Sequence, residues 1–134
     1  MSQSHVAKTV LVVDDEATVR YLLSHVLSHA GFRVEVATDG LSALEQIGSS
    51  HPDLVILDLM MPGLDGWGVL DRLRDDPLHP PVLVVSAHGD SETPARAVKA
   101  GAAGYMTKPF ALKQLVQTCG RLMAAAVTST ARQR

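Results

Sequence analysis

The sequence predicts a single α/β domain in which helices cover both faces of a parallel, doubly wound sheet. First, the apolar runs at residues 10–13, 54–57 and 82–85 are continuous, as in strands buried on both faces. Second, segments with helical spacing separate these runs, which is the pattern of repeated strand–helix units. Third, the length of 134 residues suits one domain.

Five segments are expected to form the strands. They are residues 10–13, 32–37, 54–57, 82–85 and 104–107. The second alternates, with Phe32, Val34 and Val36 on one side, and the fifth has the weakest pattern. The third runs straight into Asp58 and a Pro-Gly turn, which places a carboxylate at the end of a buried strand. Such a carboxylate is costly unless another group pairs with it.

A helix is expected after each strand, because apolar residues recur there at intervals of three and four. The helices fall at about residues 19–30, 41–47, 67–73, 93–100 and 112–126. Gly31, Gly48 and Gly101 are expected to end the first, second and fourth of them. Right-handed crossovers then limit how the five units can be arranged.

Composition places the chain among ordinary globular proteins, with 46% hydrophobic and 19% charged residues. No run approaches the ~18 apolar residues that span a membrane, and residues 1–8 lack the apolar segment of a signal peptide. The single cysteine, Cys119, excludes an internal disulfide and lies on an apolar helix stripe. We therefore expect a protein of the reducing cytoplasm. We expect residues 1–8 to be disordered, residues 9–126 to form the domain, and residues 127–134 to be a disordered tail or the start of a linker.

Charge is unevenly distributed although the net charge is only −2. No acidic residue follows Glu92, so the last third of the chain is purely basic. Its basic residues are Arg96, Lys99, Lys108, Lys113, Arg121, Arg132 and Arg134. Two interpretations remain open: a solvated helix face, or a docking surface for an acidic partner.

Reactive side chains follow four of the strands. Asp14 and Asp15 follow the first, Asp58 the third, Ser86 the fourth and Lys108 the fifth. The carboxyl ends of parallel strands share one edge of the sheet, so these groups are expected to converge. Two carboxylates about 5 Å apart repel by roughly 3 kcal/mol at an effective dielectric near 20, and one lysine does not neutralise three. We predict an Mg²⁺ site beside a nucleophilic carboxylate, suited to holding a transferring phosphoryl group.

Four segments carry a resemblance to a known family. They are Val12-Val13-Asp14-Asp15, the run from Leu57 through Asp58 and Pro62 to Gly66, Val85-Ser86-Ala87, and Thr107-Lys108-Pro109-Phe110. Together they resemble the receiver domain of two-component response regulators, over about residues 8–126. The resemblance implies a flavodoxin-like (βα)5 fold, as in chemotaxis regulators, with sheet order 2-1-3-4-5. It also implies a signalling switch that catalyses only its own phosphorylation and dephosphorylation.

The resemblance assigns a role to each site residue. Asp58 would accept a phosphoryl group from the phosphohistidine of a sensor histidine kinase or phosphotransfer protein. Asp15, Asp58 and the backbone carbonyl of Met60 would bind Mg²⁺ directly, and Asp14 would bind it through water. Lys108 would contact the phosphoryl oxygens.

The same resemblance implies how phosphorylation is read. Ser86 would hydrogen-bond to the phosphoryl group, Tyr105 would turn inward as an aromatic switch, and the bond before Pro109 would be cis. The surface of the fourth helix, fifth strand and fifth helix would change and bind an unknown downstream protein at the basic 92–126 face. No nucleic acid or membrane contact is expected. Residues 101–105 lack the acids of the salt-bridged dimers formed by winged-helix regulators, so we expect a monomer before phosphorylation.

Several alternatives remain open. His88 is either a loop histidine or a group that tunes hydrolysis of the acyl phosphate. A phospho-aspartyl phosphatase-type enzyme is disfavoured because Met60 stands where its second acid would be. A nucleotide or flavin binder is disfavoured because no Gly-rich loop follows the first strand. The sequence does not distinguish a stand-alone receiver from one excised from a larger regulator or hybrid kinase.

Overall fold

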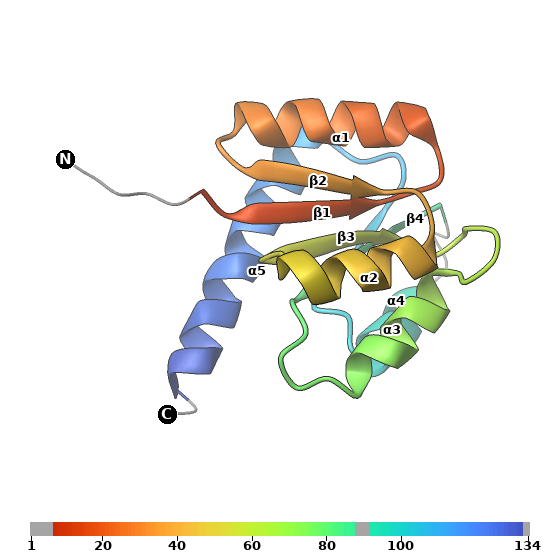
Figure 1. Ribbon diagram of the computed structural model, residues 1–134. Helices are drawn as coiled ribbons and strands as arrows, with labels where there is room; N and C mark the ends of the chain where they lie inside the picture. Colours follow the sequence, from red (N-terminus) through yellow and green to blue (C-terminus); the bar gives the residue numbers. More distant parts are fainter. Residues whose placement is uncertain (1–6, 88–91, 133–134) are drawn as a thin grey trace.

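The fold consists of five strand–helix units in succession (Figure 1). The computed structural model describes residues 7–87 and 92–132, with side chains as far as residue 126. The elements are β1 (Thr9–Val13), α1 (Ala17–His29), β2 (Arg33–Ala37), α2 (Gly40–Ser50), β3 (Leu54–Asp58), α3 (Gly66–Arg74), β4 (Val82–Ser86), α4 (Glu92–Lys99), β5 (Gly104–Thr107) and α5 (Leu112–Arg132). Each strand and helix expected from the sequence is present.

The five strands form one parallel sheet in the order β2-β1-β3-β4-β5, which confirms the predicted flavodoxin-like topology. The register aligns the strand ends: Val13 pairs with Ala37 and with Leu57, and Ser86 pairs with Thr107. The residues that follow the strands therefore emerge along one edge of the sheet. This edge carries the candidate site.

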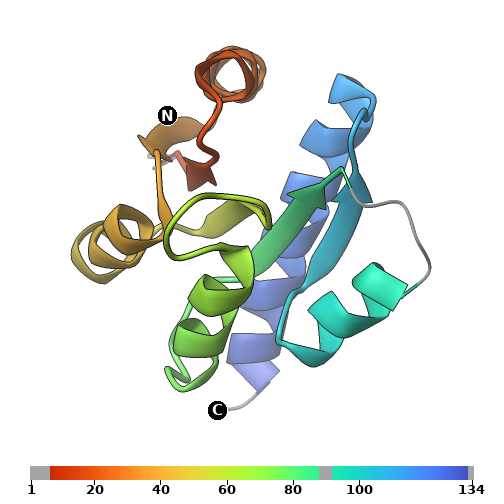
Figure 2. The same cartoon turned by 90° about the vertical axis from the view of Figure 1, so that its right-hand side faces the viewer.

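Helices cover both faces of the sheet (Figure 2), and a separate hydrophobic core lies on each face. One contains Val10 and Val12 of β1 together with buried residues of α1 and α5. The other contains Leu11 and Val13 together with buried residues of α2, α3 and α4. Successive residues of a strand point to opposite faces, so a strand covered on both sides needs an unbroken apolar run. Cys119 is fully buried in the first core, as its position on an apolar stripe predicts.

One helix end differs from the prediction. The α2 helix continues through Gly48 to Ser50 and ends at His51, whose φ of 50° is left-handed. Gly48 lies on the exposed side of the helix and faces open space, so nothing there forces an end. Pro52 follows His51, and the residue before a proline is disfavoured in the right-handed helical conformation. The proline, rather than the glycine, therefore marks the end of α2.

The last helix also differs from the prediction. It continues past residue 126 to Arg132, whereas the sequence predicts a disordered tail from residue 127. Residues 121–132 contain three consecutive alanines and neither glycine nor proline, so no residue interrupts the helix. Of the residues expected to be disordered, 1–6 and 133–134 lie outside the described residues, whereas Lys8 is held by a hydrogen bond from the Arg33 N–H to its carbonyl at 2.8 Å. In the part of the chain that the structure describes, no helix is long and apolar enough to cross a membrane.

Candidate functional site

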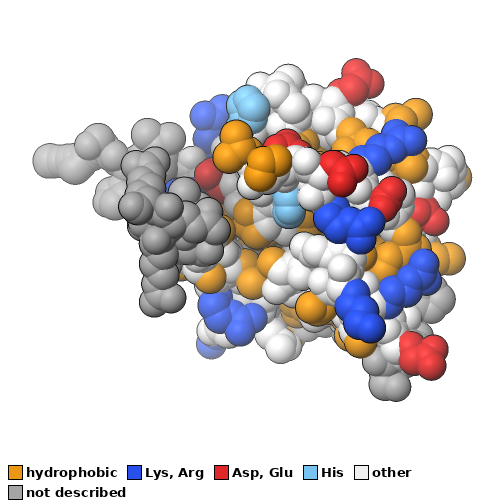
Figure 3. Space-filling view, turned by 90° about the horizontal axis from the view of Figure 1, so that it is seen from below, with side chains coloured by type: hydrophobic (Ala, Val, Ile, Leu, Met, Phe, Trp, Pro, Cys, Tyr) orange, Lys and Arg blue, Asp and Glu red, His pale blue; other side chains and the backbone are white. Residues whose placement is uncertain are grey.

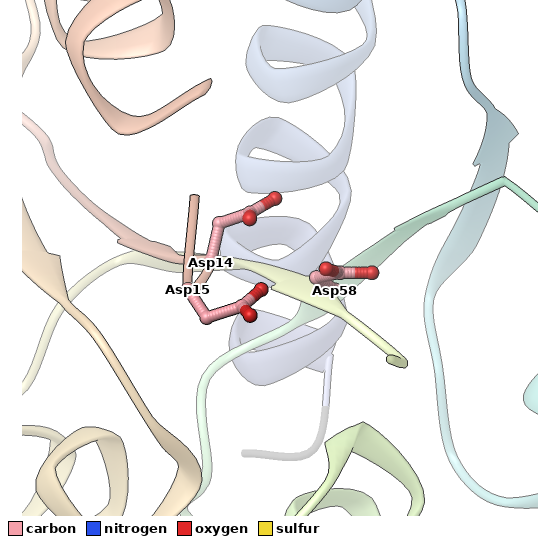
Figure 4. A group of neighbouring side chains, drawn as sticks. All are labelled: Asp14, Asp15 and Asp58. Atoms are coloured by element: carbon pink, nitrogen blue, oxygen red, sulfur yellow. The ribbon is translucent and has the colours of Figure 1, made fainter. Parts of the chain in front are cut away.

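Three carboxylates meet at the carboxyl edge of the sheet (Figure 4). Asp14 and Asp15 follow β1, and Asp58 is the last residue of the adjacent strand β3. One oxygen from each carboxylate lies within 4.8 Å of one from each of the others. Asp14 and Asp58 are buried, with 3% and 5% of their surface exposed, whereas Asp15 is exposed to solvent.

Lys108 supplies a positive charge to this cluster from the residue directly after β5. Its Nζ lies 2.9 Å from Asp14 Oδ2, 3.7 Å from Asp58 Oδ2 and 3.9 Å from Glu16 Oε1. Its backbone N–H donates to the Ser86 carbonyl at 2.8 Å, which ties the end of β5 to the end of β4. The Lys108-Pro109 peptide bond is cis, as the family resemblance implies.

Asp14 is held at every polar atom. Its N–H donates to the Ala37 carbonyl at 3.3 Å, and its own carbonyl accepts from Arg20 Nη1 at 2.8 Å. Its Oδ1 accepts from the Glu16 N–H at 2.9 Å, and its Oδ2 accepts from Lys108. By contrast, the Asp15 carboxylate makes no hydrogen bond or ion pair among the described residues. The site thus joins a fixed carboxylate, Asp14, to one that no described residue contacts through a hydrogen bond or ion pair, Asp15.

Asp58 is electrostatically strained. Burial raises the pKa of its carboxyl, and the charges of Asp14 and Asp15 raise it further. A hydrogen bond from the Met60 N–H at 3.2 Å and the charge of Lys108 oppose this shift without cancelling it. Burial and the neighbouring carboxylates thus disfavour the ionised form of Asp58 more than Met60 and Lys108 favour it.

The pKa of Lys108 is raised as well, and for an ammonium this favours the charged form. Burial by itself lowers the pKa of its ammonium, but the hydrogen bond from Lys108 to Asp14 and the charges of Asp14, Asp58 and Glu16 outweigh burial. The net result is a pKa above its ordinary value of 10.5. Lys108 is consequently a fixed positive charge at neutral pH.

Gly66 allows the chain after Asp58 to fold back onto the end of β3. Its N–H donates to the Leu59 carbonyl at 3.1 Å. A Cβ at this position would lie only 2.5 Å from the Asp58 carbonyl oxygen and 2.6 Å from Leu59 Cα. Asp65 caps the helix that starts here, accepting from the Gly68 N–H at 3.0 Å. The Asp-Gly pair at the start of α3 therefore shapes the loop that carries the residues after Asp58.

The remaining expected site residues occupy different environments. Ser86 is fully buried at the end of β4, and Tyr105 of β5 is partly buried against the core next to α4. The Met60 side chain is 57% exposed. His88 lies outside the described residues.

Arg20 is the site residue that sequence reasoning missed. It lies near the start of α1, where a cation opposes the partial positive charge of the helix N-terminus. A cation in that position is a signal for a specific partner, and its partner is the Asp14 carbonyl.

The donor set fits a hard divalent cation. Among the described residues it offers carboxylate oxygens from three residues and one nearby lysine, so three negative charges face one positive charge. Mg²⁺ prefers such oxygen ligands and completes its octahedral shell with water.

Comparison with known proteins identifies the class. The family model of the response regulator receiver domain matches residues 10–119, and the chain belongs to this family of two-component signalling domains. Receiver domains of this kind are signalling domains rather than conventional enzymes.

The named relatives of the chain are response regulators as well. The response regulator MprA of Mycobacterium ulcerans is 45% identical over 107 residues, which are 80% of this chain and 46% of that protein. The chain thus spans about half the length of the curated relatives it matches.

Solved structures show the same fold. The receiver domain of the Francisella response regulator 1452 has a TM-score of 0.85 and 32% identity, covering 89% of this chain and 98% of that one. The chemotaxis protein CheY4 of Vibrio cholerae has a TM-score of 0.82 and 31% identity, covering 87% and 99%.

Proposed function

We propose that this receiver is a phospho-acceptor switch in which Asp58 takes a phosphoryl group from the phosphohistidine of a sensor histidine kinase or phosphotransfer protein. The observation that carries the proposal is the position of Asp58. It is a buried carboxylate at a strand end, with its pKa raised, between two other carboxylates and one lysine. A bound cation would supply the positive charge that offsets the negative charge of these carboxylates.

The proposed Mg²⁺ ligands are the carboxylates of Asp15 and Asp58 and the backbone carbonyl of Met60, with Asp14 acting through water. The Asp15 carboxylate, which has no partner among the described residues, supports a direct ligand role, and the hydrogen bonds that both Asp14 carboxylate oxygens already accept support an indirect one. When bound, Mg²⁺ neutralises part of the charge shared by the carboxylates and the phosphoryl oxygens.

In the transfer step, a carboxylate oxygen of Asp58 attacks phosphorus while the P–N bond of the phosphohistidine breaks. The bonding electron pair moves to the imidazole nitrogen, and the product is an acyl phosphate. Lys108 stabilises the phosphoryl oxygens, and the Ser86 hydroxyl donates a hydrogen bond to one of them. Tyr105 then turns inward. Loss of the phosphoryl group to water resets the switch.

The proposed output surface comprises α4, β5 and α5, within the basic 92–126 face. Its exposed cations include Arg96, Lys99, Lys113 and Arg121, and its only acid is Glu92. Figure 3 shows the face at the bottom of Figure 1, where α3 lies, and acidic, basic and hydrophobic side chains mix on it. The excess of exposed cations over the single acid Glu92 supports an acidic protein partner at the basic 92–126 face. We further propose a cytoplasmic monomer before phosphorylation that makes no direct nucleic acid or membrane contact.

The experiment is intact mass spectrometry after incubation with acetyl phosphate and Mg²⁺, beside Asp58→Ala and a sample with chelator. The expected result is gain of one phosphoryl group by the wild type alone, and only with Mg²⁺ present. Equal gain by Asp58→Ala would contradict the proposal.

A further inference from the structure

Arg20 connects α1 to the acid cluster, which consists of Asp14, Asp15 and Asp58, through a single backbone atom. Its Nη1 donates to the Asp14 carbonyl at 2.8 Å, and its side chain is partly buried. We propose that Arg20 is a positioning residue for Mg²⁺: by holding the Asp14 carbonyl, it fixes the direction in which the Asp15 carboxylate leaves the chain. The inference rests on the proposed function, because it needs Asp15 to be a metal ligand.

The physical link is the planarity of the peptide bond. The Asp14 carbonyl and the Asp15 nitrogen belong to one rigid peptide unit. A hydrogen bond that sets the orientation of this carbonyl therefore also sets the position of the Asp15 Cα. The Asp15 carboxylate makes no hydrogen bond or ion pair of its own among the described residues, so its placement depends on the backbone before it.

The other hydrogen bonds of Asp14 do not set the orientation of its carbonyl. Its N–H is tied to the Ala37 carbonyl of the neighbouring strand, and its carboxylate is tied to the Glu16 N–H and to Lys108. These bonds fix Asp14 up to its Cα and side chain. Within the described chain, Arg20 holds the next group, the Asp14 carbonyl. This carbonyl belongs to the peptide bond that joins the fixed Asp14 to the exposed Asp15.

Helix stability does not explain the placement of Arg20. The α1 helix begins at Ala17, so Arg20 brings a cation close to the helix N-terminus, where the dipole disfavours it. The same charge also opposes binding of a cation at the acid cluster. Positioning and charge therefore make opposite predictions for the loss of Arg20. Pure charge loss tightens Mg²⁺ binding, whereas loss of the hydrogen bond weakens it.

The test compares Arg20→Met, which removes both donor and charge, with Arg20→Lys, which keeps both. Arg33→Met is the matched control, because Arg33 is exposed at the start of β2, at the opposite end of the sheet. The Mg²⁺ dissociation constant is measured by isothermal titration calorimetry. Thermal unfolding without Mg²⁺ shows whether each variant is folded.

We expect Arg20→Met to weaken Mg²⁺ binding about tenfold, the lower end of the range for residues that orient metal ligands. Arg20→Lys should lie within about threefold of the wild type, because one donated hydrogen bond is all that the lysine must replace. Phosphorylation from acetyl phosphate should need more Mg²⁺ in Arg20→Met but reach the wild-type rate at saturation.

Unchanged or tighter Mg²⁺ binding by Arg20→Met would overturn the inference and leave the proposed function intact. A lysine variant as weak as Arg20→Met would also overturn it. If the wild type itself binds no Mg²⁺ at millimolar concentration, the proposed function fails and the inference fails with it.

Discussion

Lys108 donates a hydrogen bond to Asp14 and only an ion pair links it to Asp58: its Nζ lies 2.9 Å from Asp14 Oδ2 and 3.7 Å from Asp58 Oδ2. The lysine therefore stands beside Asp58 without fully neutralising it, which agrees with the raised pKa of that carboxyl. A phosphoryl group on Asp58 would place further oxygens near an ammonium that is already held. Among the described residues, Lys108 is the cation that ion-pairs with Asp58, and it is shared with Asp14 and Glu16.

Replacing Lys108 tests this balance. We predict that Lys108→Met lowers the free energy of unfolding at pH 7 by about 1–3 kcal/mol, because it leaves two buried carboxylates without their cation. Mg²⁺ should restore more stability to this variant than to the wild type. Denaturant unfolding with and without Mg²⁺ measures both effects. Lys113→Met, at an exposed position of α5, is the control, and an equal loss there would refute the prediction.

Asp58 should make stability depend on pH. Its folded-state pKa is raised, so the folded chain binds this proton more tightly than the unfolded chain, and stability falls as pH rises from the ordinary value of 3.8 through the raised one. Asp58→Asn cannot ionise, so at pH 7 and without Mg²⁺ we expect it to be more stable by about 1–2 kcal/mol.

The measurement is the difference in unfolding free energy between wild type and Asp58→Asn from pH 4 to 7. The difference should grow with pH and shrink when Mg²⁺ is added. A difference that is constant across this range would show that Asp58 does not titrate as the structure implies.

Two glycines should respond oppositely to alanine. Gly66→Ala places a Cβ against the Asp58 carbonyl oxygen, so we predict a loss of about 1–3 kcal/mol and slower phosphorylation. Gly48→Ala faces open space inside α2, so we predict a gain of about 0.5–1 kcal/mol and unchanged phosphorylation. Thermal unfolding and intact mass provide the two readouts. A neutral Gly66→Ala would mean that the loop after Asp58 adapts freely.

The single tryptophan reports on α4. Arg96 of α4 lies over the Trp67 ring of α3, with its Cζ 4.0 Å from the ring centroid. We predict that acetyl phosphate with Mg²⁺ changes the Trp67 emission if the basic 92–126 face is remodelled, because this contact spans α3 and α4. Arg96→Ala should abolish most of the change while still accepting phosphate. An unchanged emission spectrum in a phosphorylated sample would argue against movement of α4.

The sequence predicts the fold and the convergence at the site for the same physical reason. Continuous apolar runs such as residues 54–57 require a covered parallel sheet, and such a sheet brings its carboxyl ends to one edge. The position of Asp58 beside Asp14 and Asp15 follows from that geometry.

Other features required three-dimensional distances. The preference of Lys108 for Asp14 over Asp58 depends on less than 1 Å, which no residue pattern encodes. The bond from Arg20 joins a side chain to a backbone carbonyl, and a carbonyl has no sequence signature. From the sequence, Gly48 is expected to end α2, whereas the structure shows that the helix continues to Ser50, shortly before Pro52.

The most direct measurement locates the phosphoryl group. Wild-type protein is incubated with acetyl phosphate and Mg²⁺, reduced with borohydride and digested, and the peptides are sequenced by mass spectrometry. Borohydride converts an aspartyl phosphate to homoserine, so our prediction is homoserine at position 58 and aspartate at positions 14 and 15. Homoserine at position 14 or 15, with aspartate retained at 58, would contradict it.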